Sequence, residues 1–309
     1  MNRPRGGKPG GSRRGSGPSR GPSKSQRPAA RAAKKSGAPR SRGAGRTGPV
    51  RVEGRERAPE KTLGGEQVEG RQAVRELLLA QRRRVREIWI SADLRDDEAV
   101  EDIVALAAAN RVPVEYVARK RLEVAARSEA PQGVLARAAP LPEADFGALL
   151  KRRPCHAPFL VAVDSVTDPG NLGAIIRSCD GAGVHGVVVP RHRAAHVTPT
   201  VAKAAAGAVE HVPVAVVPGI PAALARMKEA GIWVVGLDDA ADLSLFDLGD
   251  LATEGICLAL GAEGAGLSRL VRERCDLLVA IPMRGRVGSL NVSAAAALAT
   301  FEVARFRGG

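Results

Sequence analysis

The chain has 309 residues, a length that favours about two domains, and a formal net charge of +14. Residues 1–50 hold 14 of the 47 Lys and Arg residues and no Asp or Glu, so the remainder, with 33 of each sign, is formally neutral. This excludes a uniformly basic, histone-like protein. Because no run of 18 apolar residues and no apolar signal-peptide core occurs, we expect no membrane partner and no secretion.

The first predicted segment, residues 1–65, is a disordered basic tail. Its first fifty residues contain one Val and no Ile, Leu or aromatic residue. Such a segment cannot bury enough apolar surface to offset its ordering entropy. Its charge favours salt-sensitive contacts with RNA phosphates, and a tail that only solubilises the protein is the alternative.

Residues 66–140 are predicted to form a small α/β domain, because helical and extended patterns alternate there. Helices are expected over 68–79, 98–109 and 120–127, and strands over 85–90, 112–117 and 133–136. Residues 141–157, which are punctuated by proline and contain Lys151-Arg152-Arg153, are predicted to be a linker.

Residues 158–309 are predicted to form a second α/β domain. Its aliphatic runs lack polar alternation, as in strands buried on both faces, and helical segments separate most of them, which predicts a parallel sheet. The six expected strands are 159–163, 186–190, 212–217, 232–235, 256–260 and 277–281. The expected helices are 172–181, 200–208, 220–230, 268–273 and an Ala-rich final helix, 292–305.

Ligands of such sheets bind beyond the carboxyl ends of the strands, so the loops that follow the strands are candidate sites. Segments 164–171, 261–268 and 282–291 are rich in glycine and small polar residues, and glycine lets a ligand approach the backbone closely. Neither G-x-G-x-x-G nor a phosphate-binding P-loop occurs, which disfavours a nucleotide-dependent oxidoreductase. The four cysteines form no C-x-x-C pair, so we expect free thiols, a cytoplasmic location and no bound metal.

Three segments in these loops resemble the motifs of the SpoU/TrmH family of RNA 2′-O-ribose methyltransferases, in the SPOUT class. They are Asn171-Leu-Gly-Ala-Ile-Ile-Arg177, Leu260-Gly-Ala-Glu-Gly-Ala-Gly-Leu267, and Ile281-Pro-Met followed by Ser289-Leu-Asn-Val-Ser293. The resemblance covers about residues 66–306. It implies S-adenosylmethionine as cofactor, RNA as substrate, a C-terminal parallel sheet with a trefoil knot, and a homodimer. Leu172, Ile175 and the final helix are expected to offer apolar faces for pairing.

Residues 66–140 resemble the L30e-like substrate-binding domain of the 23S rRNA guanosine-2′-O-methyltransferases in this family. Gly70-Arg-Gln-Ala-Val-Arg-Glu76 is similar to its start and Gln132-Gly-Val134 to its end, whereas Pro131 stands where members usually have His. The resemblance implies methylation of a guanosine in large-subunit rRNA. A tRNA 2′-O-methyltransferase and a non-catalytic ribosome-associated RNA-binding protein remain alternatives, and no DNA partner is expected.

The resemblance implies catalytic roles for Asn171, Arg177, Glu263, Ser289 and Asn291. Arg177 is expected near the ribose 2′-hydroxyl, where its permanently charged guanidinium suits phosphate binding and stabilisation of a developing alkoxide better than proton abstraction. Asn171 would orient Arg177 or the ribose, or cap its helix. Glu263 would pair with Arg177 or the substrate, and Ser289 could instead cap the final helix.

The cofactor is expected to bind through backbone groups and apolar contacts with its adenine. The residues assigned to this role are Gly236, Leu237, Gly261, Ile281 and Leu290.

Overall fold

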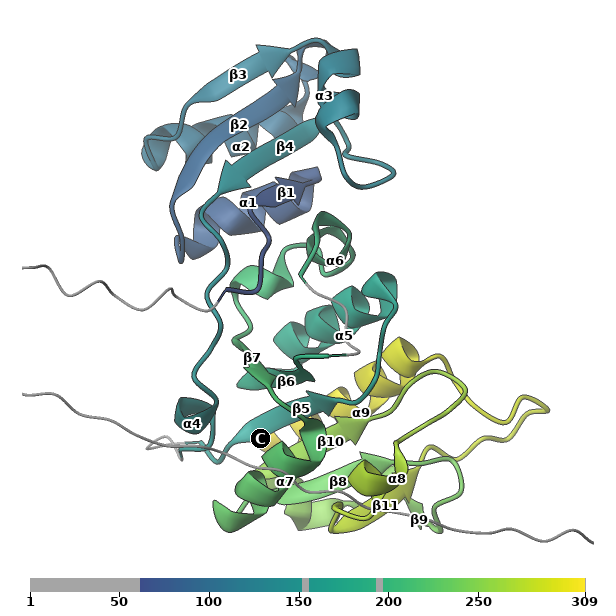
Figure 1. Cartoon of the computed structure of the whole chain (residues 1–309). Helices are drawn as coiled ribbons and strands as arrows, with labels where there is room; N and C mark the ends of the chain where they lie inside the picture. The colour runs from purple at the N-terminus through teal and green to yellow at the C-terminus, as the bar shows by residue number, and fades with distance from the viewer. Residues whose placement is uncertain (1–61, 152–155, 193–196, 309) are drawn as a thin grey trace, which may run out of the picture. The chain divides into compact units, whose positions relative to one another are not determined.

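The computed structural model describes residues 62–151, 156–192 and 197–308 (Figure 1). All but the last four residues of the predicted tail lie outside this range, as do residues 152–155 of the predicted linker. Within the described residues, no helix has the length and apolar character needed to cross a bilayer.

Residues 67–138 form a four-stranded sheet with helices on both faces. In spatial order the strands are β1 (Gln67–Glu69), β4 (Val134–Ala138), β2 (Val85–Ser91) and β3 (Val114–Val117). Only the β2–β3 pair is parallel. Helices α1 (Arg71–Ala80) and α2 (Glu98–Ala109) bury their apolar residues against one face. Helix α3 (Arg119–Ala125) packs on the other, and the 3-10 turn η1 (Ala92–Leu94) follows β2.

The prediction for this region is confirmed for α2, whose bounds match, and approximately for the three strands and α3. The start of the first predicted helix is wrong. Val68 lies in β1, where it pairs with Ala136, and the helix begins only at Arg71. Gly70 separates the two elements with φ +97°, a conformation that glycine adopts without a Cβ clash.

Residues 159–280 contribute the strands of a seven-stranded sheet in which every pair is parallel, as predicted. The spatial order is β7 (Val214–Val217), β6 (Gly186–Pro190), β5 (Phe159–Val163), β10 (Ile256–Leu260), β8 (Trp233–Leu237), β11 (Leu277–Ala280) and β9 (Leu243–Ser244). Strand β9 was not predicted, since two residues carry no recognisable pattern.

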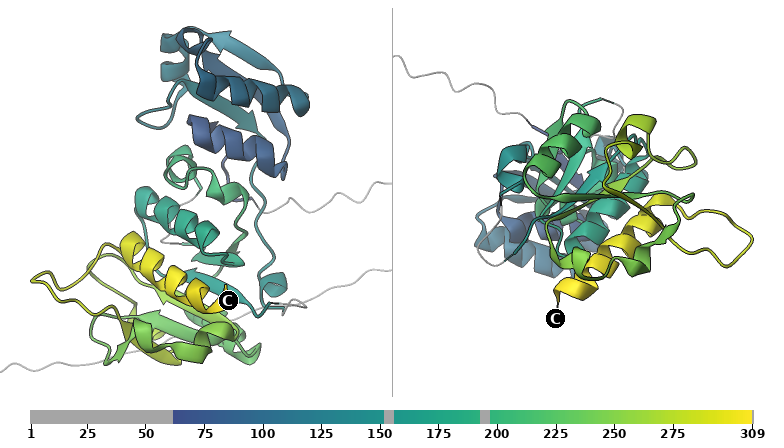
Figure 2. Two further views of the ribbon diagram at one scale, coloured as in Figure 1. Left: turned by 180° about the vertical axis from the view of Figure 1, so that it is seen from behind. Right: turned by 90° about the horizontal axis from the view of Figure 1, so that it is seen from below.

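Helices cover both faces of this sheet. On one face, α5 (Pro169–Gly181) packs against α6 (Pro199–Ala204) and runs beside α9 (Val292–Arg307) (Figure 2). On the other face lie α4 (Phe146–Leu149), α7 (Ile220–Glu229) and α8 (Arg269–Arg272). The predicted linker therefore contains a short helix, because Phe146 and Leu149 bury their side chains in this core. Three 3-10 turns complete the fold: η2 (Ala208–Glu210), η3 (Leu245–Asp247) and η4 (Gly249–Thr253).

Leu172 and Ile175 are not available for pairing with a second copy, contrary to expectation. Their side chains are 2% and 0% exposed and belong to the core beneath α5. On this face, Leu298 and Phe301 of α9 are 42% and 52% exposed.

A buried ion pair joins the turn after α1 to η2. Arg83 Nη2 lies 2.5 Å from Glu210 Oε1, and the two side chains are only 3% and 1% exposed. Arg83 Nη1 also donates to the carbonyl oxygens of Gly65 and Ala139. The guanidinium thus ties together segments that lie far apart in sequence.

Candidate functional site

A cavity of about 250 Å³ lies at the carboxyl ends of β8, β10 and β11. Of the predicted cofactor residues, Leu237, Gly261, Ile281 and Leu290 line it. Gly236 does not line the cavity. A Cβ at that position would point into the packed layer under the strand, 2.7 Å from Cys275 Sγ. Gly236 therefore allows close packing of β8, and four of the five predicted residues converge on one cavity.

The loop after β10 folds back on itself to form one wall of this cavity. Ala262 and Gly266 exchange two backbone hydrogen bonds of 3.0 and 2.9 Å. A Cβ on Gly261 would lie 2.1 Å from the carbonyl carbon of Gly266, so only glycine fits there. The resulting wall is largely backbone, which can hydrogen-bond a ligand whatever the neighbouring side chains are.

Asn171 connects all three motif loops through its side-chain amide. Its Nδ2 donates to Glu263 Oε2 at 3.1 Å, in the loop after β10. Its Oδ1 accepts from Asn291 Nδ2 at 3.0 Å, in the loop after β11. The cap of α5 is Asp168, whose carboxylate accepts from the Asn171 backbone N–H at 2.6 Å. Asn171 is therefore free to act as a side-chain bridge, and it contacts Glu263 and Asn291 rather than Arg177.

Arg177 lies on α5, six residues beyond Asn171, with an exposed side chain. Within the described ranges, its guanidinium makes no hydrogen bond or ion pair, so the expected pairing with Glu263 is absent. A permanently charged fork of donors without a protein partner is suited to an anionic ligand.

Ser289 and Asn291 have different roles at the start of α9. Asn291 is the helix cap, since its Oδ1 accepts from the backbone N–H of Ser293 at 2.8 Å and from the Ser293 hydroxyl at 2.6 Å. Ser289 does not cap the helix. It lines the cavity from an exposed loop, where its hydroxyl is available to a ligand.

The sequence reasoning assigned no role to two carboxylates at strand ends. Asp164, only 7% exposed, follows β5 and accepts from the backbone N–H of Ser268 at 2.9 Å, which fixes the start of α8. Asp238 follows β8, lines the cavity and pairs with Arg272 at 3.1 Å. Their positions in the sequence could have identified them, because an acidic residue directly after a buried strand lies at the edge of a parallel sheet where ligands bind.

The cysteines that the structure describes are poor nucleophiles. Burial raises the pKa of the Cys179 and Cys257 thiols far above the usual range, and raises that of Cys275 to about 12. Nucleophilic thiol chemistry is therefore disfavoured at this site.

In the described part of the chain, no group of three or more His, Cys, Asp or Glu side chains is arranged to hold a metal ion.

Two family descriptions match the chain. The SpoU rRNA Methylase family matches residues 158–301, which include all three motif loops. The RNA 2′-O ribose methyltransferase substrate-binding family matches residues 67–144.

Individual relatives span most of the chain. The 23S rRNA (guanosine-2′-O-)-methyltransferase RlmB of Pectobacterium atrosepticum is 40% identical over 243 residues, covering 78% of this chain and 98% of that protein. The putative TrmH family tRNA/rRNA methyltransferase YacO of Bacillus subtilis is 40% identical over 242 residues, covering 77% and 94%. The crystal structure of the SpoU methyltransferase AviRb from Streptomyces viridochromogenes, in complex with AdoMet, superposes with TM-score 0.64 at 30% identity, covering 78% and 89%.

Proposed function

The chain belongs to the SpoU rRNA methylase family, and on that basis we propose that it transfers a methyl group from S-adenosylmethionine to a ribose 2′-hydroxyl of a guanosine in large-subunit rRNA. The observation that carries this proposal is the side-chain bridge through Asn171. It brings Glu263 and Asn291 to the first motif, beside a cavity that four of the five predicted cofactor residues line. Relatives at 40% identity over nearly their whole length carry this activity in their names.

The cavity fits S-adenosylmethionine by the chemistry of its lining. Leu237, Ile281 and Leu290 supply apolar contacts for adenine, and the backbone of the loop after β10 supplies polar groups for its edge. The carboxylates of Asp238 and Asp239 suit the ribose hydroxyls or the positively charged parts of the cofactor. When bound, the cofactor supplies an electrophilic methyl group on its sulfonium.

Arg177 binds the RNA phosphate next to the target ribose and stabilises the negative charge that develops on the 2′-oxygen. Its guanidinium is exposed and has no recorded partner among the described residues, so no protein ion pair must break before RNA binds. Because guanidinium stays protonated, Arg177 acts as an electrostatic stabiliser and not as the resting base.

The other motif residues position the substrate. Asn171 holds one oxygen of the Glu263 carboxylate, which leaves the second oxygen for a substrate hydroxyl or amino group. Ser289 faces the cavity, and Asn291 fixes both the α9 start and the amide of Asn171. Alignment of the reacting groups by such contacts supplies a large part of the rate enhancement of group-transfer enzymes.

The proposal extends to the rest of the family architecture. We propose that the chain around β10 and β11 forms a trefoil knot, that residues 66–140 adopt an L30e-like fold that binds RNA, and that the protein is a cytoplasmic homodimer. The strand order, with β10 between β5 and β8, supports the knot. Exposed Leu298 and Phe301 on α9 support pairing near the cofactor loops. Light scattering at micromolar protein, giving twice the chain mass of 32.2 kDa, tests the dimer.

The experiment that tests the function maps 2′-O-methylation in rRNA from cells with and without this protein. Loss of methylation at one large-subunit guanosine is the expected result. Loss at a tRNA ribose would support the tRNA alternative. An unchanged map, together with RNA binding by the purified protein, would support a non-catalytic role.

A further inference from the structure

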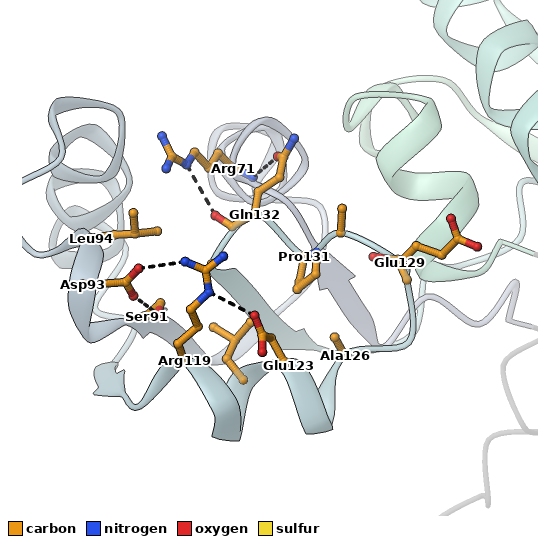
Figure 3. Close-up of a pocket in the computed structure, with 14 residues that line it drawn as sticks. Arg71, Ser91, Asp93, Leu94, Arg119, Glu123, Ala126, Glu129, Pro131 and Gln132 are labelled. Atoms are coloured by element: carbon orange, nitrogen blue, oxygen red, sulfur yellow. Dashed lines mark hydrogen bonds and ion pairs between the residues drawn. The ribbon is translucent and has the colours of Figure 1, made fainter.

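A second hollow, of about 760 Å³, lies in the small N-terminal domain, outside the site described above. It is bounded by the end of β2, the start of α1, helix α3 and residues 126–133 (Figure 3). We call it the α3 hollow. The methyl-transfer mechanism uses none of its residues, although the domain matches a substrate-binding family.

One wall of the α3 hollow is held rigidly by a buried carboxylate. Glu69, which is 0% exposed, accepts from the backbone N–H groups of Arg127 and Ser128 at 2.7 and 2.9 Å, and also from the Ser128 hydroxyl. At the other end of the wall, Gly133 has φ +72°, and a Cβ there would lie 2.3 Å from Leu94 Cδ1. The wall is thus shaped before any ligand arrives.

Two guanidiniums at the α3 hollow are paired with carboxylates. Arg119 points between two carboxylates, with Nη1 3.3 Å from Asp93 Oδ2 and Nε 3.0 Å from Glu123 Oε1 (Figure 3). Arg71 forms a two-point pair with Asp97, at 2.9 and 3.2 Å, and its Nε donates to the Gln132 carbonyl oxygen. A guanidinium that is held at its edge keeps its flat face available for stacking on an aromatic ring. The Arg119 side chain is 71% exposed, so this face is open.

The charge of the lining selects against phosphate. Three carboxylates and two guanidiniums contribute to the α3 hollow, namely Asp93, Glu123, Glu129, Arg71 and Arg119. The hydrogen bond from Ser91 is the main cause that lowers the pKa of Asp93, so this carboxylate stays ionised and accepts hydrogen bonds only. A planar ligand that presents N–H donors at its edge therefore fits, whereas an anion does not.

We propose that the α3 hollow binds one unpaired nucleobase of the RNA substrate, and that it favours bases with an exocyclic amino group over uracil. This inference rests on the proposed function, which makes RNA the substrate. The base stacks on the Arg119 guanidinium and donates its amino N–H groups to Asp93 or Glu123. Sequence-specific RNA recognition commonly uses such splayed-out bases, stacked on aromatic or guanidinium planes, and carboxylates accept from amino groups of bases. Uracil presents carbonyl oxygens where the other bases carry the amino group, so the carboxylates disfavour it.

The test compares binding of labelled hexanucleotides of adenosine, cytidine and uridine to the full chain, without S-adenosylmethionine. Fluorescence anisotropy is measured at several salt concentrations and extrapolated to about 1 M salt, where the phosphate contribution of the tail vanishes. Wild-type protein is expected to bind the adenosine and cytidine oligomers more tightly than the uridine oligomer, by at least about fivefold, the lower end of the discrimination that hydrogen bonds to base edges supply. Arg119→Ala should remove this preference.

Arg121→Ala is the matched control, because Arg121 lies on the same helix and pairs with Glu115, but does not line the α3 hollow. It should keep the preference. Equal wild-type binding of all three oligomers would overturn the inference. A uniform loss with Arg119→Ala, accompanied by a salt slope smaller by about one, would also overturn it, since that marks a phosphate contact. These oligomers are not methylation substrates in the assay, so failure of the proposed methyl transfer would be recognised separately.

Discussion

Replacement of Asn171 tests whether the side-chain bridge organises the site. Asn171→Ala removes the hydrogen bonds of 3.1 Å to Glu263 and 3.0 Å from Asn291. Both are partly solvent-exposed, so the free energy of unfolding should fall by only about 1 kcal/mol. Turnover should fall about 100-fold, because displacement of catalytic groups by about 1 Å has effects of this size.

Asn171→Asp should reduce turnover further. It places a carboxylate oxygen where Nδ2 now lies, 3.1 Å from Glu263 Oε2. At that separation two charges in a water-like dielectric repel by about 1 kcal/mol, and added salt weakens the repulsion. The Asp variant should therefore recover part of its activity as salt is raised, whereas the Ala variant should not.

The assay is single-turnover methyl transfer to an rRNA fragment, with cofactor affinity measured separately by calorimetry. Asp145→Ala is the control, because it also removes an exposed side-chain hydrogen bond, the 2.7 Å cap of α4 from the Gly147 N–H, but far from the motif loops. It should lower stability by about 1 kcal/mol and leave turnover unchanged. Turnover of Asn171→Ala within about threefold of wild type would refute the idea that the bridge positions catalytic groups.

Three further predictions concern other parts of the chain. Glu210→Gln leaves Arg83 buried without its counter-charge, so calorimetry should show a loss of about 3–5 kcal/mol; a loss below about 1 kcal/mol would mean that the pair is not buried in solution. The raised pKa of about 12 keeps Cys275 a neutral thiol at pH 8. Peptide-resolved mass spectrometry should therefore show that the alkylation rate of Cys275 rises about tenfold per pH unit up to pH 11. Rapid alkylation at pH 8 would contradict its burial. Deletion of residues 1–62 should preserve cofactor binding. It should lower the slope of log RNA affinity against log salt concentration by several units, because all of the formal net charge lies in residues 1–50. An unchanged slope would favour a tail that only solubilises the protein.

The strands that the sequence predicts best are those with an uninterrupted aliphatic run. The bounds of β5, β6 and β10 match the prediction, because burial on both faces demands apolar residues at every position. The helical spacing of Val74, Leu77 and Leu78 does not show where their helix begins. Val68 was therefore misassigned, since the positive φ of Gly70, which separates β1 from α1, cannot be read from the sequence pattern. Strand β9 is held by pairing with β11 and not by its own two residues.

The structure brings Asn171, Glu263 and Asn291 together, but their contacts could not be predicted from the sequence. Asn171 and Glu263 are 92 residues apart in sequence, and Asn171 and Asn291 are 120 apart. Which of these polar side chains meet depends on the strand order, which places β10 next to β5. Local patterns carry no information on that order, and so Glu263 was expected to pair with Arg177 or the substrate, whereas its carboxylate contacts Asn171.

The central claim is that Arg177 stabilises the transition state of methyl transfer and does not hold the cofactor. The most direct measurement compares Arg177→Ala with wild type in two assays: single-turnover methyl transfer to the rRNA fragment, and calorimetry with S-adenosylmethionine. Because Arg177 lies outside the cofactor cavity, we predict that turnover falls by about 100- to 1,000-fold, as for loss of one oxyanion donor, with cofactor affinity within a few-fold of wild type. Near wild-type turnover, or loss of cofactor binding that matches the loss of activity, would contradict the claim.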